Sequence, residues 1–161
     1  MKERLASVCS ISKGTGRIIV LVLLTAFISN VAKSQDAAPL MAIANLSGAT
    51  AEMKLSELKT VLKGQQQRWK NGDKVVIALM KTTTPAGKET AAKIYNMSPN
   101  EVNKFWLALV FQGKAQAPNF FSSADELERF VSQNPGAIGI TDQPITSPEV
   151  QTISIDGQKS F

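Results

Sequence analysis

The sequence predicts a single layered α/β domain, with a mixed sheet of about four strands and four helices. Residues 75–80 (VVIALM) form an uninterrupted apolar run of strand length, which is typical of a strand covered on both faces and not of a one-sided sheet. Ser98 and Ser123 each begin a helix-start pattern that leads into apolar residues at helical spacing. Residues 134–141 (NPGAIGIT) place a Pro-Gly helix stop directly before a short run of small apolar residues.

The composition excludes several kinds of chemistry. The 161 residues suggest one domain, which contains no histidine and only one cysteine, Cys9. Histidine general bases, cysteine nucleophiles and the usual zinc ligand sets all need imidazole or thiolate groups. An enzyme would have to work with Ser, Thr, Lys or carboxylates, and no nucleophile and base pair made of a Ser or Thr with a Lys is recognisable. We therefore expect a protein that is not an enzyme and that has no metal and no cofactor.

The net charge of +5 lies mostly at the amino-terminal end of the chain. The first 34 residues hold five basic side chains against Glu3, whereas the remainder holds 13 Lys and Arg against 12 Asp and Glu. A nearly neutral body lacks the basic stripe that binding to a phosphate backbone needs. The sequence therefore predicts no nucleic-acid partner.

Residues 1–34 have the organisation of a signal peptide. A basic segment ends at Arg17, residues 18–28 are apolar, and Ala32 and Ser34 are the small residues that a signal peptidase reads. An uncleaved membrane anchor is the alternative, but the apolar run is shorter than the roughly 20 residues of a spanning helix. We expect cleavage before Gln35, a folded domain over residues 35–161, a periplasmic or secreted location, and contact with the membrane only through the leader.

The first half of the domain is expected to contain two strands and one helix. Residues 40–46 are a short apolar run that predicts a buried strand. Leucines at helical spacing predict a helix over residues 55–62, with Gly64 just beyond it as a left-handed cap. A polar loop over residues 64–73 contains Trp69 and leads into the strand at 75–80.

The second half is expected to contain two capped helices and two strands. Ser98 with Glu101 and Ser123 with Glu126 match the capping-box pattern. In the first of these helices an apolar face is expected to point inward, formed by Val102, Phe105, Trp106, Leu109 and Val110. Residues 137–141 predict a tightly packed strand in which Gly139 lets a neighbour lie close. Residues 150–155 predict a last strand at an edge of the sheet, because half of them are polar.

The order of these signals resembles a known family. The residues that carry the likeness are L-x-x-V-L-K-G at 58–64, Trp69, Asn71-Gly72, Phe105-Trp106, 111–114 (FQGK), Pro118, Ser123 and 135–139 (PGAIG). Together they look like the phosphate-type periplasmic substrate-binding proteins of ABC importers, and more narrowly like their short, single-lobe relatives. The resemblance implies a fold like one lobe of a type II periplasmic binding protein.

The resemblance also implies a ligand site. In two-lobed phosphate binders the oxyanion is held by hydroxyls and by backbone amides at helix N-termini, with the help of an Arg, and helix starts do present unpaired N–H groups to anions. The matching segment here follows the strand at 75–80, and Lys81 stands where the family has its Arg, supplying charge without a two-pronged donor. Pro85-Ala86-Gly87 replaces the family's Ser-Gly-Thr. The expected ligand residues are Lys81, Thr82, Thr83, Thr84, Gly87 and Lys88, where a helix is expected to start.

Other interpretations of these residues remain open. The three threonines are also typical N-cap and turn residues. Ser47 and Thr50, in the turn after the first strand, are a second place where an anion could bind. Trp69 fits either the edge of the core or a partly exposed contact for a partner.

Two functions follow from these observations. The first is an exported solute-binding-like domain that captures phosphate or a similar small oxyanion for an ABC importer. The alternative is an envelope interaction module that keeps the fold without binding a ligand and contacts another envelope protein, or an ABC permease, through residues 65–70. The alternative predicts that changing Trp69 to Ala removes partners while the thermal midpoint stays unchanged.

Overall fold

The computed structural model describes residues 38–161, which form one α/β unit with a six-stranded mixed sheet. The signal peptide predicted for residues 1–34 and the cleavage predicted before Gln35 lie outside the described residues. The strands are β1 (Met41–Asn45), β2 (Glu52–Met53), β3 (Val76–Met80), β4 (Asn119–Phe121), β5 (Ala137–Thr141) and β6 (Val150–Ile155). The helices are α2 (Leu55–Leu62), α3 (Pro85–Thr90), α4 (Pro99–Phe111) and α5 (Ala124–Gln133), and α3 continues into a π-helical turn, η2 (Ala91–Tyr95).

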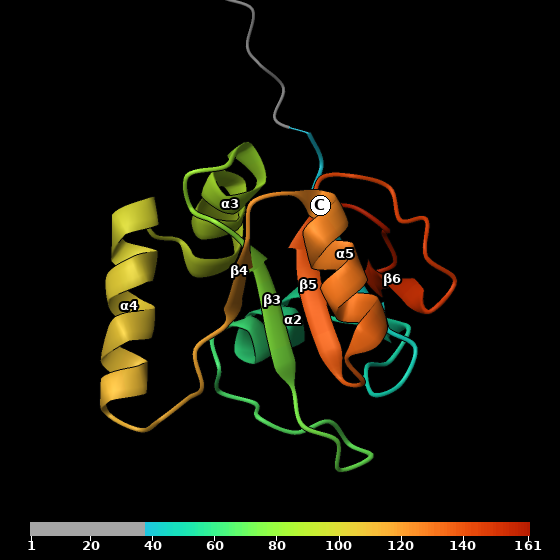
Figure 1. The fold of residues 1–161 in the computed structure, drawn as a ribbon, viewed down its shortest axis with the longest axis horizontal. Helices are drawn as coiled ribbons and strands as arrows, with labels where there is room; N and C mark the ends of the chain where they lie inside the picture. The colour runs from blue at the N-terminus through green and yellow to red at the C-terminus, as the bar shows by residue number, and fades with distance from the viewer. Residues whose placement is uncertain (1–37) are drawn as a thin grey trace, which may run out of the picture. The chain divides into compact units, whose positions relative to one another are not determined.

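The strand order in the sheet is β2-β6-β1-β5-β3-β4 (Figure 1). β3 is parallel to both β4 and β5, whereas β1 is antiparallel to β5 and β6. The carboxyl ends of β3, β4 and β5 therefore meet at one edge of the sheet. The carboxyl end of β1 lies at the opposite edge.

The layered α/β architecture with a mixed sheet and four helices is confirmed, and the strand count is six instead of about four. The additional strands, β2 and β4, have two and three residues, too few for a periodic pattern to reveal. The prediction of β6 as an edge strand is wrong, because β2 pairs with it on the side away from β1. The polar residues of β6 are thus half-buried within the sheet.

The core lies between the central strands and the helices on their two faces. In Figure 1, α5 lies in front of β5 and α2 lies behind the strands. All five residues of β5 are buried, and Leu127 of α5 lies against Gly139, where a Cβ would come within 2.9 Å of the leucine Cδ2. A larger residue at position 139 would push α5 away from the sheet. The predicted role of Gly139, to let a neighbour pack closely, is therefore confirmed.

Both predicted serine caps are present. Ser98 Oγ accepts a hydrogen bond from the Glu101 N–H, and the Glu101 carboxylate accepts one from the Ser98 N–H at 2.7 Å. Hydrogen bonding of the Glu101 carboxyl to the side chain and to the backbone N–H of Ser98 holds its pKa below the usual value. Ser123 caps α5 in the same way. The Glu126 carboxylate, however, bonds the N–H of Ser122 and not that of Ser123, so the second capping box is only half formed.

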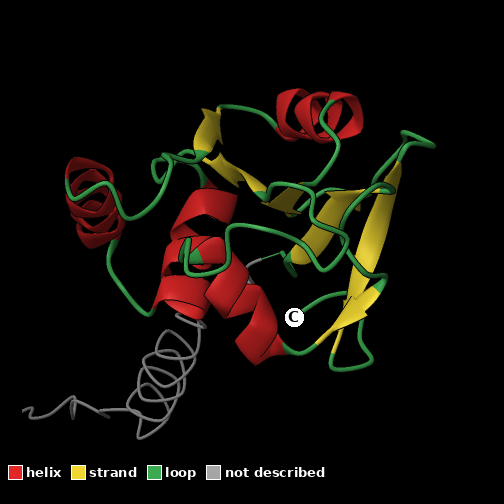
Figure 2. Ribbon diagram, turned by 90° about the horizontal axis from the view of Figure 1, so that it is seen from below, coloured by secondary structure: helices red, strands yellow, loops and turns green. Residues whose placement is uncertain are grey.

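The inward face predicted for α4 is narrower than expected. Val102 and Trp106 are buried, Phe105 and Leu109 pack against the core, and Val110 is 41% exposed. The prediction for Val110 is therefore wrong. The reason is the place of α4 at the margin of the fold, beside η2 and the short edge strand β4 (Figures 1 and 2), where only one side of the helix is covered.

Candidate functional site

The candidate site is the turn between β3 and α3, at the edge where the parallel strands end. The Lys81 N–H donates to the carbonyl oxygen of Phe121 in β4 at 2.9 Å, which holds the start of the turn on the sheet. The Thr84 N–H donates back to the Lys81 carbonyl oxygen at 2.9 Å and closes the turn. Lys81, Thr82, Thr83 and Thr84 are thus brought into one tight bend.

Thr84 is the N-cap of α3. Its Oγ1 accepts a hydrogen bond from the Gly87 N–H at 3.1 Å and donates one to the Lys81 carbonyl oxygen at 2.8 Å. Pro85 occupies the first helical position, where its lack of an N–H does no harm. The helix therefore starts at Pro85, three residues before the predicted start at Lys88, because the Thr-Pro pair is itself a helix-start signal.

Gly87 has a packing role in this turn. A Cβ at position 87 would overlap the carbonyl oxygen of Lys81 and would come within 3.0 Å of that of Met80. Only glycine lets the first turn of α3 lie this close to the end of β3. The Pro-Ala-Gly sequence found here in place of Ser-Gly-Thr thus still builds a compact strand-to-helix connection.

The free donors of the turn are backbone amides. Within residues 38–161, the N–H groups of Thr82, Thr83 and Ala86 have no hydrogen-bond partner. The Thr82 hydroxyl is engaged with the side-chain amide of Asn103 in α4, whose Nδ2 lies 3.2 Å away. The side chains of Lys81, Thr83 and Lys88 are exposed. The turn therefore carries two unpartnered N–H groups, one free hydroxyl and the Lys81 ammonium, and the start of α3 adds the N–H of Ala86, a residue that is only 2% exposed, and the Lys88 ammonium.

Ser47 and Thr50 lie elsewhere. They follow β1, so they are at the edge of the sheet opposite Lys81. The Thr50 hydroxyl donates to the carbonyl oxygen of Glu52 at 2.8 Å, and the Ser47 carbonyl oxygen accepts from the Gly136 N–H at 2.7 Å. The structure does not bring these two residues together with the turn after β3, and the Thr50 hydroxyl is already engaged with the backbone.

Trp69 belongs to the edge of the core. It is 7% exposed, and its Nε1–H donates to the carbonyl oxygen of Gly136 at 2.8 Å. Gly136 has a φ of +77°, which favours glycine. The Pro-Gly stop of NPGAIGIT thus anchors the indole ring. The hypothesis that Trp69 is an exposed contact for a partner is wrong.

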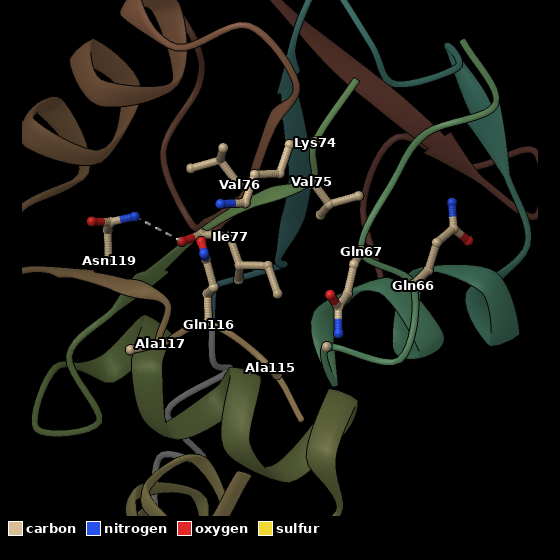
Figure 3. A pocket seen from close by; sticks show the side chains of 11 residues that line it. Gln66, Gln67, Lys74, Val75, Val76, Ile77, Ala115, Gln116, Ala117 and Asn119 are labelled. Carbon is tan, nitrogen blue, oxygen red and sulfur yellow. Dashed lines mark hydrogen bonds between the residues drawn. The ribbon is translucent and has the colours of Figure 1, made fainter. Parts of the chain in front are cut away.

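A hollow of about 60 Å³ lies at the other end of β3, near Lys74 and Ile77 (Figure 3). Gln66, Gln67 and Asn119 contribute carboxamides to its lining. This hollow is separated from Lys81 by the length of the strand, so the two regions cannot hold one small ligand together.

The described part of the chain has neither a candidate metal site nor a candidate membrane-spanning helix. Residues 38–161 contain no group of three or more His, Cys, Asp or Glu side chains that could hold a metal ion. None of their helices has both the length and the hydropathy needed to cross a membrane.

Comparison with solved structures identifies the fold. No protein-family model matches this sequence, and no curated protein matches it. An ABC-type phosphate transport receptor from Vibrio cholerae matches with a TM-score of 0.59 at 14% identity, over 76% of this chain and 48% of the receptor. PstS from Borrelia burgdorferi matches with a TM-score of 0.54 at 13% identity, over 74% of this chain and 48% of PstS.

The domain therefore has the fold of one lobe of the phosphate-type binding proteins, as the resemblance implied. The chain spans about half the length of these solved structures. Their names describe transport receptors and binding proteins and not enzymes. The TM-scores of 0.59 and 0.54 establish the fold. Because the identities are only 14 and 13%, the ligand must be argued from this chain's own residues.

Proposed function

We propose that the protein is an exported solute-binding-like domain that captures phosphate or a similar small oxyanion. The turn from Lys81 to Lys88 is the proposed site, with Lys81 and Lys88 supplying charge. The observation that carries the proposal is the set of three unpartnered N–H groups in this turn, on Thr82, Thr83 and Ala86. Thr82 and Thr83 are adjacent, and successive free N–H groups in a turn form an anion-binding concavity.

The location of the turn supports the same ligand. In open α/β sheets, ligands bind beyond the carboxyl ends of the parallel strands, and the turn follows the carboxyl end of β3 beside that of β4. The ammonium of Lys81 is exposed there and can approach an anion as a point charge. Thr83 adds the hydroxyl that is free to rotate toward it. Thr84 and Gly87 have structural roles in this scheme, because they cap and pack the start of α3.

The first test is thermal unfolding with and without phosphate. A ligand that binds only the folded state stabilises it by RT ln(1 + [L]/Kd), which is about 1.4 kcal/mol at a tenfold excess over Kd. For a domain of this size the midpoint should rise by about 5 °C. Sulfate in a parallel series distinguishes phosphate from oxyanions in general.

Two lysine variants give the matched control. Lys81→Met removes the charge after β3, whereas Lys74→Met removes an equally exposed charge before it. We expect the phosphate-induced rise to fall by half or more in the first variant and to persist in the second. The absence of any rise at millimolar phosphate or sulfate in the unchanged protein would contradict the proposal.

An interaction module without a ligand is the alternative. An envelope protein or an ABC permease would be the partner, and the match to transport receptors makes a permease a reasonable candidate for either function. The aromatic residue of the loop at residues 65–70 cannot make this contact, because Trp69 is buried. Changing Trp69 to Ala would remove core packing, so this variant cannot separate partner binding from stability.

Export depends on the leader at residues 1–34, and its processing can be measured directly. We expect the protein recovered from the periplasm or the medium of an expressing bacterium to begin at Gln35, because small residues precede that position. Amino-terminal sequencing of the purified protein checks this. A membrane-bound chain that still begins at Met1 would contradict it and would favour an uncleaved anchor.

A further inference from the structure

The edge of β3 that faces β4 has a gap in its hydrogen bonding. The pairing with β4 begins only at Ala78, which lies opposite Asn119. Nearer the amino-terminal end, the Val75 N–H donates to the carbonyl oxygen of Gln67 at 2.9 Å, in the loop before the strand. Two segments thus bond to the same edge of β3 and leave a gap between them.

Two backbone groups face this gap. The Val76 N–H donates to the carbonyl oxygen of Gly136, beside β5, at 3.2 Å. Consecutive residues of a strand point to opposite edges, so the N–H of Ile77 and the carbonyl oxygen of Val75 both point to the edge with the gap. Within residues 38–161, neither of these two groups has a hydrogen-bond partner.

The hollow of about 60 Å³ at the amino-terminal end of β3 lies at this gap. Val75 and Ile77 both line it, and they are only 9% and 8% exposed. Buried backbone N–H and C=O groups are nearly always paired, with water or a ligand where the protein supplies no partner. The gap therefore suits a small molecule that carries one donor and one acceptor close together.

Polar side chains from two separate segments surround the hollow (Figure 3). The Nδ2 or Nε2 groups of Gln67 and Asn119 donate to backbone carbonyl oxygens, at 2.7 and 3.5 Å, and their side-chain oxygens stay free to accept. The Gln116 carboxamide and the Lys74 ammonium also line the hollow and are exposed. The hollow thus combines acceptors, donors and one positive charge.

We propose that this hollow binds a small α-amino acid, glycine or alanine, as its zwitterion. The α-ammonium donates to the carbonyl oxygen of Val75 and to the free carboxamide oxygens. The carboxylate accepts from the Ile77 N–H, from the Gln116 carboxamide and from the Lys74 ammonium. The ligand thereby supplies the donor and the acceptor that one residue of a neighbouring strand would supply.

Size and polarity favour this ligand over simpler ions. A water-sized group needs about 10–15 Å³, so the hollow of about 60 Å³ has room for roughly five non-hydrogen atoms, the size of glycine or alanine. An anion alone would leave the Val75 carbonyl oxygen unpaired and facing negative charge, and an amine alone would leave the Ile77 N–H unpaired. The turn after β3 differs, because its free backbone groups are all donors and suit an anion.

The experiment is equilibrium dialysis of the purified protein against radiolabelled glycine in a phosphate-free buffer. We expect glycine to be retained and unlabelled L-alanine to displace it. Acetate and methylammonium, the two halves of the zwitterion, should not displace it at the same millimolar concentration. L-Leucine should compete at least about tenfold more weakly, because its side chain exceeds the space. No retention of glycine at millimolar concentration would overturn the proposal, as would equal competition by acetate.

Side-chain variants test the location of the site. Gln116→Met removes a carboxamide from the hollow, and Gln112→Met is its matched control, because Gln112 is also exposed and does not line the hollow. Lys74→Met removes the charge. We expect Gln116→Met and Lys74→Met each to raise the dissociation constant for glycine about fivefold, as for exposed polar groups. Gln112→Met and Lys81→Met should leave it unchanged, and equal weakening by either of these two would overturn the proposal.

Nuclear magnetic resonance reads the backbone groups directly. In the ¹⁵N-labelled protein, glycine should shift the amide signal of Ile77 and leave those of Thr82 and Thr83 in place. Phosphate should do the reverse if the proposed anion site is correct. The two proposed sites lie at opposite ends of β3, so either can fail without the other. Glycine binding that leaves the Ile77 signal unchanged would overturn the placement in this hollow.

Discussion

Asn45 is the polar side chain that connects the sheet to α5. It is 6% exposed at the end of β1, and its Nδ2 donates to the carbonyl oxygens of Val131 and Ser132 at 3.0 and 2.9 Å. Its Oδ1 accepts from the Ser47 N–H at 2.8 Å. One amide thus satisfies two carbonyl groups of the last turn of α5 and one N–H of the β1 turn.

Changing Asn45 to Ala should lower the free energy of unfolding by about 2 kcal/mol, because buried backbone groups would lose their partners. Urea unfolding monitored by circular dichroism measures the loss. Asn100→Ala is the control, since Asn100 is exposed and should change stability by less than about 0.5 kcal/mol. A loss at Asn45 no larger than at Asn100 would show that water replaces these hydrogen bonds.

Single residues differ in how far the sequence reveals their role. Ser98 and Ser123 were predictable as caps, since the cap and its partner are three residues apart. The bond of Trp69 to Gly136 spans 67 positions and that of Asn45 to Val131 spans 86. No local sequence pattern indicates such distant pairs. The sequence therefore leaves the role of Trp69 undecided, and it does not reveal the role of Asn45 at the end of an apolar run.

At the scale of elements, the carboxylate of Glu128 ties α5 to the loop before β6. Its Oε1 accepts hydrogen bonds from the N–H groups of Thr146 and Ser147, both at 2.6 Å, and from the Thr146 hydroxyl at 3.2 Å. Partial burial acts to raise the pKa of Glu128, but the bonds from Ser147 and Thr146 outweigh it and hold the pKa below its usual value.

This shift predicts a dependence of stability on pH. A carboxyl whose pKa is lower in the folded state stabilises that state above its unfolded pKa of about 4.3. The contribution is lost as the pH falls through the folded pKa. Glu128→Gln should therefore be less stable than the unchanged protein at pH 7, by about 1 kcal/mol or less because the group is partly exposed. The two proteins should converge as the pH falls through the lowered folded pKa of this carboxyl.

Chemical denaturation at a series of pH values measures this difference. A gap between the two proteins that stays the same at pH 3 and pH 7 would mean that the charge of Glu128 does not matter to the loop. A gap that widens toward acid would contradict the direction of the pKa shift.

Elements with strong local signals were predicted well. β1, β3 and β5 coincide with apolar runs, and α2, α4 and α5 coincide with leucine spacing or capping patterns. β2 and β4 have neither signal, because each is formed by pairing with a strand that is distant in sequence. The prediction for the outer side of α4 was also wrong. The helix lies at the margin of the fold, where the core covers only part of its apolar surface.

At the scale of the whole molecule, the motif order led to the correct fold although the identity to the matched structures is only 13 or 14%. Gly136 and Gly139 were informative because a Cβ at either position would meet neighbouring atoms within 3.0 Å. The ligand site stays a prediction. Lys81 to Thr84 form a turn that leads into α3, which carries Lys88. Ser47 and Thr50, the second place considered for an anion, lie at the far edge, because β1 runs antiparallel to β5, which a linear sequence does not show.

The position of β6 between β1 and β2 has a consequence for the timing of folding. Both neighbours of β1 come from residues 137–155, so a nascent polypeptide cannot complete the middle of the sheet until this distant segment has been synthesised. Strand pairs this far apart in sequence also form slowly once the chain is complete. For the export proposed above, slow pairing would keep the polypeptide unfolded while it crosses a membrane.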